Sequence, residues 1–231
     1  MKSRAIFLDR DGTLVYPIHY PTRPEQLQLY ANLGPALQVL QEMGFLLVVV
    51  TNQSGLARGY FAEADLEQMH LHLRAEFVRM NVALSGIYAC PHHPDGSIPE
   101  LAIECECRKP RPGLLLRAAE DLHIDLANSW LVGDILDDVE AGKLAGCRSI
   151  LVDLGTEAAP ESPVRQPDFV ARDTLHALRI ISAVEQIHSA IELYASASAQ
   201  AQPPVELFYQ PRAWRKAAHP GKQEISGASH G

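Results

Sequence analysis

Long apolar runs and positive charge are both in short supply in this sequence. No apolar run reaches the roughly 18–20 residues that a membrane helix needs. Lys and Arg number 20 against 28 Asp and Glu, which leaves a net charge of −8. A nucleic acid or an anionic lipid surface requires a basic face on its partner. We therefore expect neither nucleic acid nor membrane among the binding partners.

Cysteine is scarce as well, and no phosphate-binding loop of the Gly-x-x-x-x-Gly-Lys-Ser/Thr kind occurs, which disfavours nucleotide-driven transfer. The chain's 4 cysteines are too few for a disulfide framework. Three of them, Cys90, Cys105 and Cys107, lie close together, which in a reducing compartment favours a metal site. The apolar segment 5–8 is cut short by Asp9, so we expect a cytoplasmic protein without a signal peptide.

The bulk of the chain has the composition of a globular protein, with 47% hydrophobic and 21% charged residues in 231. Short apolar runs, typical of strands buried on both faces, alternate with helical patterns. Strands are predicted at 5–8, 45–50, 86–89, 130–132, 149–152 and 168–170, and helices at 34–43, 63–80, 113–122 and 138–145. This alternation predicts an α/β fold with a Rossmann-like, doubly wound parallel sheet, in which ligands bind beyond the carboxyl ends of the strands.

The last part of the chain has a different character. Apolar residues recur at helical spacing over residues 173–194, which predicts an amphipathic helix capped by Asp173 or Thr174. From residue 195 the sequence becomes rich in Ala, Ser, Gln and Pro, as low-complexity linkers are. We expect a main domain over residues 1–172, the helix over 173–194, and a linker with a disordered tail over 195–231.

Two carboxylates, Asp9 and Asp11, follow the first predicted strand. At positions i and i+2 of an extended segment they point the same way, and Gly12 allows a turn directly after them. One of two paired carboxylates can stay ionised as a nucleophile while the other is protonated as an acid, because like charges a few ångströms apart raise the pKa of one of them. A solvated turn is the alternative, since Asp and Gly are ordinary turn residues. The apolar strand before them and Thr13 after them favour a shared pocket.

Three further strand ends or loops carry polar residues. Segment 51–55, Thr-Asn-Gln-Ser-Gly, can donate hydroxyl and backbone N–H groups to an oxyanion, although strands commonly end in such turns. Segment 108–113 either holds cations beside a helix N-terminus, where anions bind, or is a solvated basic loop. Segment 133–138 offers Asp oxygens to a hard cation or to a helix N-cap. Singly, none of these segments decides a function; their order and spacing do.

In this order the segments resemble the motifs of the haloacid dehalogenase-like hydrolase superfamily, which are Asp-X-Asp-X-Thr, a strand-final Thr or Ser, a Lys, and Gly-Asp with a further Asp. The match extends from about residue 5 to about residue 155. The resemblance implies a phosphatase in which Asp9 attacks phosphorus, and Asp11 acts first as the acid and then as the base. Thr51 and Lys109 would hold the transferring group.

The same resemblance implies a catalytic Mg²⁺ bound by the Asp9 side chain, the Asp11 backbone carbonyl and Asp134. Asp138 would orient these ligands rather than bind the ion. The large cap domain of many relatives has no counterpart, because no segment between the motifs is long enough to form one. An uncapped site should be open, and it suits a substrate that brings its own bulk or a second charged group.

Two i, i+2 pairs of metal-ligating residues precede the Arg-Lys-Pro sequence: Cys90 with His92, and Cys105 with Cys107. Thiolates and imidazole in a set of four suit tetrahedral Zn²⁺. Four protein ligands leave no open position, so we expect a structural zinc that holds a loop unable to build a core. The alternative is a set of scattered buried cysteines with a surface His pair. His93 could also replace His92 as a ligand.

With a zinc loop at residues 90–107, the sequence resembles the D-glycero-D-manno-heptose 1,7-bisphosphate 7-phosphatase branch of the superfamily. A related branch that acts on histidinol phosphate shares this arrangement. The first branch implies a small sugar phosphate as substrate, cleaved at its 7-phosphate. We expect the protein to act as a monomer. The resemblance also implies that the following residues contact the substrate: Arg10, Tyr20, Asn52, Gln53, Ser54 and Arg108.

Two departures from that branch bear on the substrate. Segment 17–20 reads Pro-Ile-His-Tyr in place of a polar loop, and Ile135 stands where the branch often has Lys. Losing one cation from a bisphosphate site costs about 1–2 kcal/mol of binding, which shifts preference toward one phosphate. The alternatives are a histidinol-phosphate phosphatase, a non-catalytic binding module and a phosphatase for nucleic-acid ends. Intact motifs argue against the module, and the net charge argues against the nucleic acid.

Overall fold

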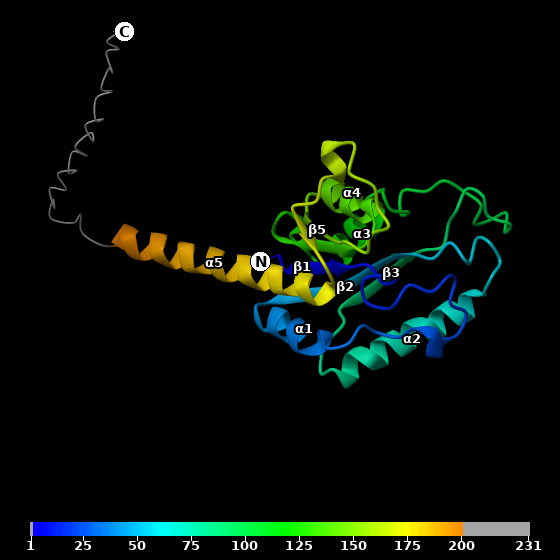
Figure 1. The fold of residues 1–231 in the computed structure, drawn as a ribbon, viewed down its shortest axis with the longest axis horizontal. Helices are drawn as coiled ribbons and strands as arrows, with labels where there is room; N and C mark the ends of the chain where they lie inside the picture. The colour runs from blue at the N-terminus through cyan, green and yellow to red at the C-terminus, as the bar shows by residue number, and fades with distance from the viewer. Residues whose placement is uncertain (1, 201–231) are drawn as a thin grey trace, which may run out of the picture. The chain divides into compact units, whose positions relative to one another are not determined.

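The computed structural model describes the backbone of residues 2–200 and the side chains of residues 2–194. Its centre is a six-stranded sheet in the order β3-β2-β1-β4-β5-β6 (Figure 1). Every neighbouring pair of strands is parallel. The strands are β1 (Arg4–Leu8), β2 (Phe45–Asn52), β3 (Gly86–Cys90), β4 (Trp130–Gly133), β5 (Arg148–Val152) and β6 (Phe169–Ala171). The predicted doubly wound parallel sheet is therefore confirmed.

β2 extends two residues beyond its predicted end, and the difference matters for the site. We expected the second strand to end at Val50, but β2 continues to Asn52, because Thr51 and Asn52 pair in register with Ala89 and Cys90 of β3. Polar residues can extend a strand where a neighbouring strand supplies hydrogen-bond partners. The polar segment after β2 thus begins inside the sheet and has a rigid backbone.

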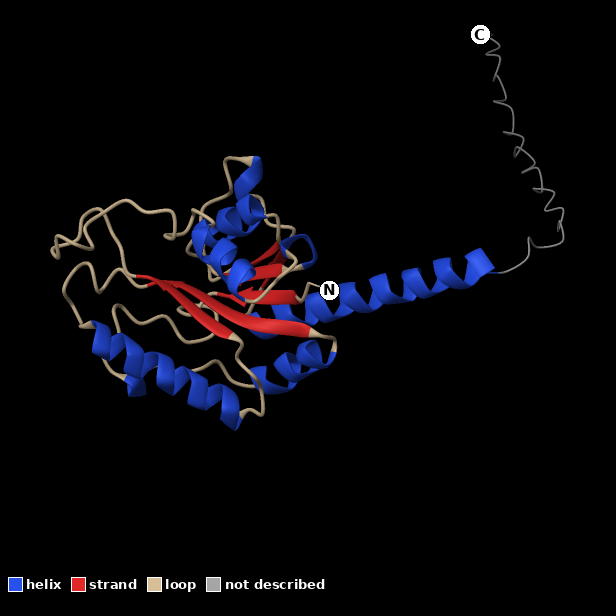
Figure 2. Ribbon diagram, turned by 180° about the vertical axis from the view of Figure 1, so that it is seen from behind, coloured by secondary structure: helices blue, strands red, loops and turns tan. Residues whose placement is uncertain are grey.

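Helices cover both faces of the sheet. They are α1 (Leu33–Glu42), α2 (Glu63–Arg79), α3 (Gly113–Asp121), α4 (Leu136–Ala145) and α5 (Thr174–Gln200), with short 3-10 helices η1 (Pro24–Gln26), η2 (Leu126–Asn128) and η3 (Pro163–Arg165). Figures 1 and 2 show α1 and α2 on one side of the sheet, and α3 and α4 on the other. All five predicted helices are present.

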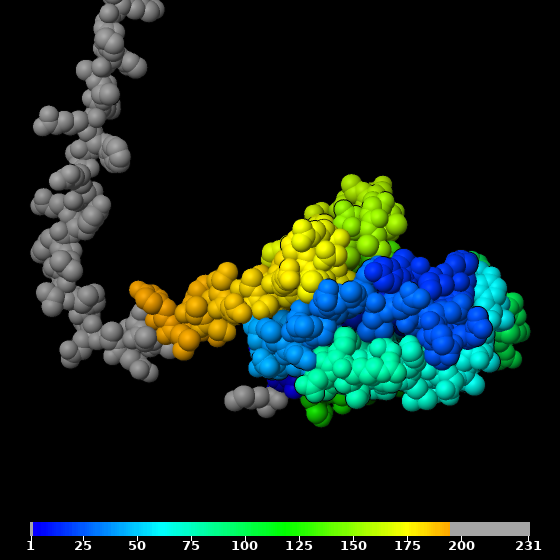
Figure 3. All heavy atoms as spheres, turned by 60° about the horizontal axis from the view of Figure 1, so that its bottom comes forward, coloured from blue at the N-terminus to red at the C-terminus, as the bar shows by residue number. Residues whose placement is uncertain are grey.

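The side chains of β1 alternate between two apolar clusters. Ile6 and Leu8 pack with residues of α1, α2 and the start of α5, whereas Ala5 and Phe7 pack with residues of α3 and α4. Such burial of both faces is typical of parallel sheets. Figure 3 shows the side chains of α1 and α2 lying side by side over one face, next to the segment that precedes α1. The core therefore holds the central strands rigidly.

The C-terminal helix begins as predicted and ends later. The Asp173 carboxylate accepts the backbone N–H of His176 at 2.7 Å, so it caps α5. We predicted an end at Tyr194 and a linker from residue 195, but α5 extends to Gln200. Ala, the strongest helix former, supplies alternate residues there. The predicted tail over 201–231 lies outside the described residues.

The first compact unit of the chain ends at Ser189, so the described part of the second unit, residues 190–200, is only the continuation of α5. None of the helices in residues 2–200 has the length and apolar character needed to cross a bilayer.

Glu185 of α5 is a buried carboxylate, with 3% of its surface exposed. It accepts hydrogen bonds from Arg4 at 2.7 Å, Arg148 at 2.6 Å and the Trp130 indole at 3.0 Å. These three donors are the first residues of β1, β5 and β4. The interaction therefore ties α5 to the amino edge of the sheet, opposite the carboxyl ends at which ligands bind in this fold.

We predict that Glu185→Gln lowers the free energy of unfolding by about 2–3 kcal/mol, because it removes the charge that two arginines share in a buried position. Urea unfolding followed by circular dichroism measures the change. Glu192→Gln, an exposed site on the same helix, is the control and should change stability by less than about 0.5 kcal/mol. Equal stability of both variants would contradict the assigned role of Glu185.

Candidate active site and metal clusters

The predicted functional residues gather at the carboxyl edge of the sheet. Asp9 follows β1 directly, Thr51 is the second-last residue of β2, and Asp134 follows β4. In this strand order the chain reverses direction of winding between β1 and β4, where doubly wound folds bind ligands. The fourth group, Lys109, comes from the loop before α3. Four segments distant in the sequence thus meet at one place.

Lys109 is a charged group buried in the site. Its ammonium lies 2.5 Å from an Asp9 oxygen and 2.5 Å from an Asp138 oxygen, and it donates to the Val50 carbonyl at 2.9 Å. Burial by itself lowers the pKa of a lysine, but here the carboxylates of Asp138 and Asp9 raise the Lys109 pKa above its usual value. The side chain therefore carries a positive charge against Asp9.

Asp9, Asp134 and Asp138 form a carboxylate cluster in which one oxygen of each lies within 4.8 Å of the others. Burial raises the pKa of Asp9 well above its usual value. The charge of Lys109 lowers this pKa, and the neighbouring carboxylates raise it again. Burial, followed by the charge of Asp138, raises the pKa of Asp134 to about 7. Three ionised carboxylates would exceed the charge of the one ammonium, and this excess negative charge contributes to the raised pKa values.

This excess charge and the oxygen donors fit a divalent cation such as Mg²⁺. Asp138 already uses one oxygen for Lys109 and the other for the backbone N–H of Ile135 at 3.3 Å. That leaves Asp9 and Asp134 as the side chains with a free oxygen for the ion. Gly12, at φ +81°, supports the arrangement, because a side chain there would collide with the Asp134 carboxylate.

Two threonines support Asp134, and the sequence analysis assigned neither of them a role in the site. The Thr13 hydroxyl donates to Asp134 at 3.4 Å, and the Thr174 hydroxyl donates to the Thr13 carbonyl at 2.5 Å. Thr13 lies within the first motif, which could have marked it. Thr174 had only the signal of a helix cap, because nothing local in the sequence indicates a contact with Thr13.

Asp11 has different partners from Asp9. Its carboxylate contacts the Arg10 guanidinium and the Gln53 amide, and the same amide donates to the Thr51 hydroxyl at 2.8 Å. Asp11 is nevertheless close enough for its charge to raise the pKa of Asp9. The side chain of Asp11 is 29% exposed, so it remains accessible from the surface.

Asn52 holds the backbone of Lys109 by two hydrogen bonds. Its amide nitrogen donates to the Lys109 carbonyl at 3.0 Å, and its amide oxygen accepts the Lys109 N–H at 3.1 Å. Because Asn52 is the last residue of β2, these bonds fix the loop to the sheet. Together with the Val50 carbonyl, the end of β2 determines where the ammonium of Lys109 lies.

Five of the six predicted substrate contacts line one hollow of about 180 Å³. They are Arg10, Tyr20, Asn52, Gln53 and Ser54, joined there by Asp11 and His19. The Tyr20 hydroxyl lies 3.4 Å from the Ser54 hydroxyl, and its ring packs edge-on against Tyr60. The sixth, Arg108, lines a separate hollow with Lys109 and Arg111, and it donates to the His92 carbonyl at 3.4 Å.

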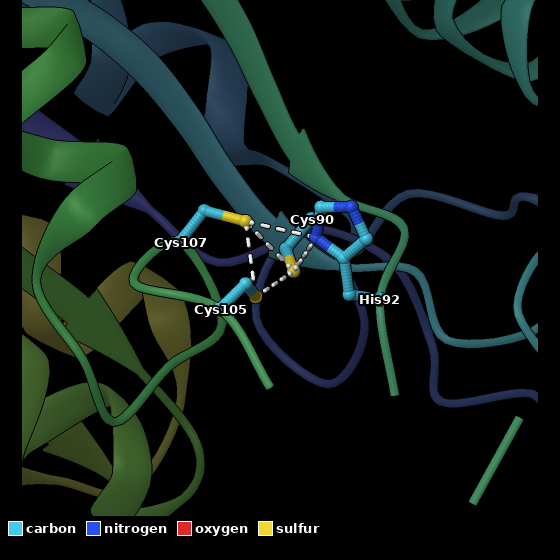
Figure 4. Close-up of side chains that lie close together, drawn as sticks. All are labelled: Cys90, His92, Cys105 and Cys107. Carbon is cyan, nitrogen blue, oxygen red and sulfur yellow. Dashed lines mark hydrogen bonds between the residues drawn. The ribbon is translucent and has the colours of Figure 1, made fainter. Parts of the chain in front are cut away.

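Cys90, His92, Cys105 and Cys107 point toward one another (Figure 4). Their sulfur and Nδ1 atoms lie within 4.8 Å of one another, with neighbouring separations of 3.2–3.7 Å. Ligands of a tetrahedral zinc are about 3.6–3.8 Å apart, given bond lengths of about 2.0–2.3 Å. The cluster is therefore compatible with zinc. His93 turns elsewhere and contacts Arg58 at 2.9 Å.

Comparisons with known proteins agree with this geometry. The model of the HAD-hydrolase-like family matches residues 106–177. The chain is 45% identical over 159 residues to the D-glycero-beta-D-manno-heptose-1,7-bisphosphate 7-phosphatase of Escherichia coli K12, an alignment that covers 68% of this chain and 83% of the relative. This chain belongs to the haloacid dehalogenase-like hydrolases. It is accordingly a phosphoric monoester hydrolase.

Two further relatives extend the comparison within the family. The protein of the same name from Pasteurella multocida is 42% identical over 167 residues, covering 72% of this chain and 90% of the relative. A crystal structure of the D,D-heptose 1,7-bisphosphate phosphatase of B. bronchiseptica, complexed with magnesium and phosphate, has 30% identity and a TM-score of 0.64. That match covers 77% of this chain and 97% of the other. The family assignment thus extends over most of the described chain.

We predict that Asn52→Ala lowers the free energy of unfolding by about 1–3 kcal/mol, because two hydrogen bonds to the Lys109 backbone are lost. Turnover should fall as well, since the ammonium loses its fixed position. Asn128→Ala removes a surface amide that donates to Asp125 and serves as the control, with a change below about 0.5 kcal/mol. Urea unfolding and phosphate release measure the two effects. A stable, fully active Asn52 variant would show that the bonds to Lys109 are dispensable.

Proposed function

We propose that this phosphatase acts on a small sugar phosphate through an aspartyl-phosphate intermediate, with D-glycero-D-manno-heptose 1,7-bisphosphate, cleaved at its 7-phosphate, as the favoured substrate. The observation that carries the proposal is the buried contact of Lys109 with Asp9, next to the carboxylate of Asp134. It supplies a nucleophile, a fixed positive charge and cation ligands in one place. The names of the relatives at 42–45% identity support the substrate.

In the first step an oxygen of Asp9 attacks phosphorus. The new O–P bond forms as the bond from phosphorus to the sugar oxygen breaks, and Asp11 gives its proton to that leaving oxygen. In the second step Asp11 takes a proton from water, whose oxygen bonds to phosphorus while the Asp9–phosphorus bond breaks. The products are the dephosphorylated sugar and inorganic phosphate, and both aspartates return to their first state.

Thr51 and Lys109 hold the phosphoryl group during both steps. Lys109 offers a permanent charge, and its position is fixed by Asp138 and by the end of β2. Thr51 is almost fully buried, so its hydroxyl works in a partly dry site, where donors act more strongly. Mg²⁺, bound by the side chains of Asp9 and Asp134 and the Asp11 carbonyl, would offset charge between the carboxylates and the phosphoryl oxygens.

The substrate lies, in this proposal, along the hollow beside Asp11. Tyr20 and Ser54 face each other there and offer hydroxyls to a sugar, and Arg108 offers a cation from the separate hollow that it lines with Lys109. Ile135, where relatives often carry Lys, weakens the hold on a second phosphate. Histidinol phosphate is the second candidate substrate, since the Glu157 carboxylate bonds to the Leu136 N–H at 2.9 Å beside this position and favours a cationic group.

The Cys–His cluster holds, in this proposal, a structural Zn²⁺ with no open position for substrate. The nearby Cys107 is only two residues before Lys109, so the ion would restrain the catalytic loop as well as the loop 90–107. A monomeric state and a cytoplasmic location complete the proposal.

We predict that phosphate release with Mg²⁺ present is fastest for heptose 1,7-bisphosphate in a panel with histidinol phosphate and sugar monophosphates, testing both heptose anomers. Asp9→Asn should lower turnover of every ester by about 10⁴-fold or more, because the nucleophile is lost. Asp121→Asn, at the other end of α3 from the Lys109 loop, is the control. Preference for histidinol phosphate would support the second candidate. Unchanged turnover by Asp9→Asn would refute the nucleophile.

We predict that freshly purified protein contains about one zinc ion per chain and that Cys107→Ser loses it, because three ligands hold zinc much more weakly than four. Cys147→Ser removes a buried thiol outside the cluster and should keep the metal. Elemental analysis gives the zinc content, and limited proteolysis reports on loop 90–107, which should be cut faster in the Cys107 variant. Zinc-free wild-type protein would end the assignment.

A further inference from the structure

Arg10 and Gln53 are buried residues of the hollow, and most of their polar groups are directed to Asp11, to Thr51 or to each other; the exception is Arg10 Nη1, which has no partner among the described residues. Arg10 is 1% exposed and Gln53 is 4% exposed. Both were expected to contact substrate. A group with so little accessible surface has little to offer a ligand unless it moves, and burial of its polar atoms requires partners inside the protein. Those partners identify a different role.

The Asp11 carboxylate receives several donors from these two side chains. Arg10 Nε donates to Oδ2 at 3.0 Å, and Arg10 Nη2 donates to Oδ1 at 3.1 Å. Gln53 Nε2 donates to Oδ2 at 3.0 Å. The paired contacts with the planar guanidinium and the third contact from the amide fix both the position and the rotation of the carboxylate. Arg10 Nη2 also lies 2.8 Å from Oδ2, so Oδ2 has the larger share of these contacts and Oδ1 the smaller.

The Gln53 amide has both N–H bonds engaged inside the protein, and its oxygen also has a partner there. Its Oε1 accepts from Arg10 Nη2 at 3.0 Å. Its Nε2 donates to Asp11 at 3.0 Å and to the Thr51 hydroxyl at 2.8 Å, which uses both N–H bonds. Turning the amide over would set its oxygen against the Asp11 carboxylate and its NH₂ against the guanidinium. The network therefore permits one orientation of the amide.

We propose that Gln53 and Arg10 are positioning residues, which hold the carboxylate of Asp11 in the orientation for proton transfer and couple it to Thr51. This inference rests on the proposed role of Asp11 as acid and base. Because the Gln53 amide bridges Asp11 and Thr51, it sets the distance between the group that moves the proton and the hydroxyl that holds the phosphoryl group. Effective proton transfer requires such fixed geometry.

The proposal separates two roles that lie in the same hollow. Ser54 and Tyr20 point their hydroxyls at each other and have capacity left for a sugar. Gln53 and Arg10 act through Asp11. Loss of a substrate contact weakens the reaction of every ester that makes the contact. Loss of acid positioning weakens the reaction most where the leaving oxygen is most basic, because such an oxygen needs a proton to depart.

The test is a series of ring-substituted phenyl phosphates of similar size, from phenyl phosphate to 4-nitrophenyl phosphate. We measure kcat/KM, which reports the first transfer to Asp9, for wild type and Gln53→Met. We expect the ratio of 4-nitrophenyl to phenyl phosphate to rise by about tenfold in the variant, because poor leaving groups lose their acid. Asp11→Asn provides the upper limit of this rise. Gln186→Met, an exposed site on α5, should leave the ratio unchanged.

A uniform fall across the series in Gln53→Met would overturn the proposal and assign Gln53 to substrate binding. An unchanged rate would also overturn the proposal, because it would show that Asp11 does not need Gln53. If Gln53→Met does not fold by circular dichroism, Arg10→Lys is measured instead, since it keeps the charge but loses the paired contact; the same rise in ratio is expected, and a uniform fall again overturns the proposal. The proposed function fails separately, when Asp9→Asn retains turnover. If turnover depends on Asp9 but the ratio of 4-nitrophenyl to phenyl phosphate does not change in the variants, only the positioning role of Gln53 and Arg10 is refuted.

Discussion

The buried ammonium of Lys109 is the interaction on which the active site depends. An unpaired lysine in this position would be deprotonated or would unfold the loop, because burying a charge without partners is costly. Two carboxylates and one carbonyl surround it. The ion pairs join the end of β1, the start of α4 and the loop before α3, so the same contacts that keep Lys109 charged also assemble the site.

The end of β2 connects this site to the Cys–His cluster. Asn52 pairs in register with Cys90 of β3, and it also binds the backbone of Lys109 through its side chain. Cys107 precedes Lys109 by two residues, so the cluster and the sheet restrain the loop from both sides. In a protein without a large cap domain among its described residues, this double attachment is what keeps an otherwise irregular loop in place.

Much of the fold and the donor sets could be predicted from the sequence. Apolar runs marked the central strands, because these strands of the parallel sheet are buried on both faces; the edge strand β6 is also apolar, although Phe169 and Val170 are exposed. The spacing Cys90–His92 and Cys105–Cys107 predicted the cluster, and Asp9 and Asp134 were predicted as ligands from their motifs. The ends of elements were less predictable. β2 extends beyond its apolar run because β3 supplies hydrogen-bond partners. α5 extends beyond residue 194 because alanine favours the helix.

What the sequence by itself determined is which residue types follow each strand, since alternation and turn residues are local properties. Only the tertiary structure decided which of these side chains face each other. Asp9 is directed to Lys109 and Asp11 to Arg10 and Gln53, although the two aspartates are two positions apart. The physical reason is that hydrogen-bond and ion-pair partners are chosen by distance in space, and the donors come from segments that meet only when the parallel strands are packed.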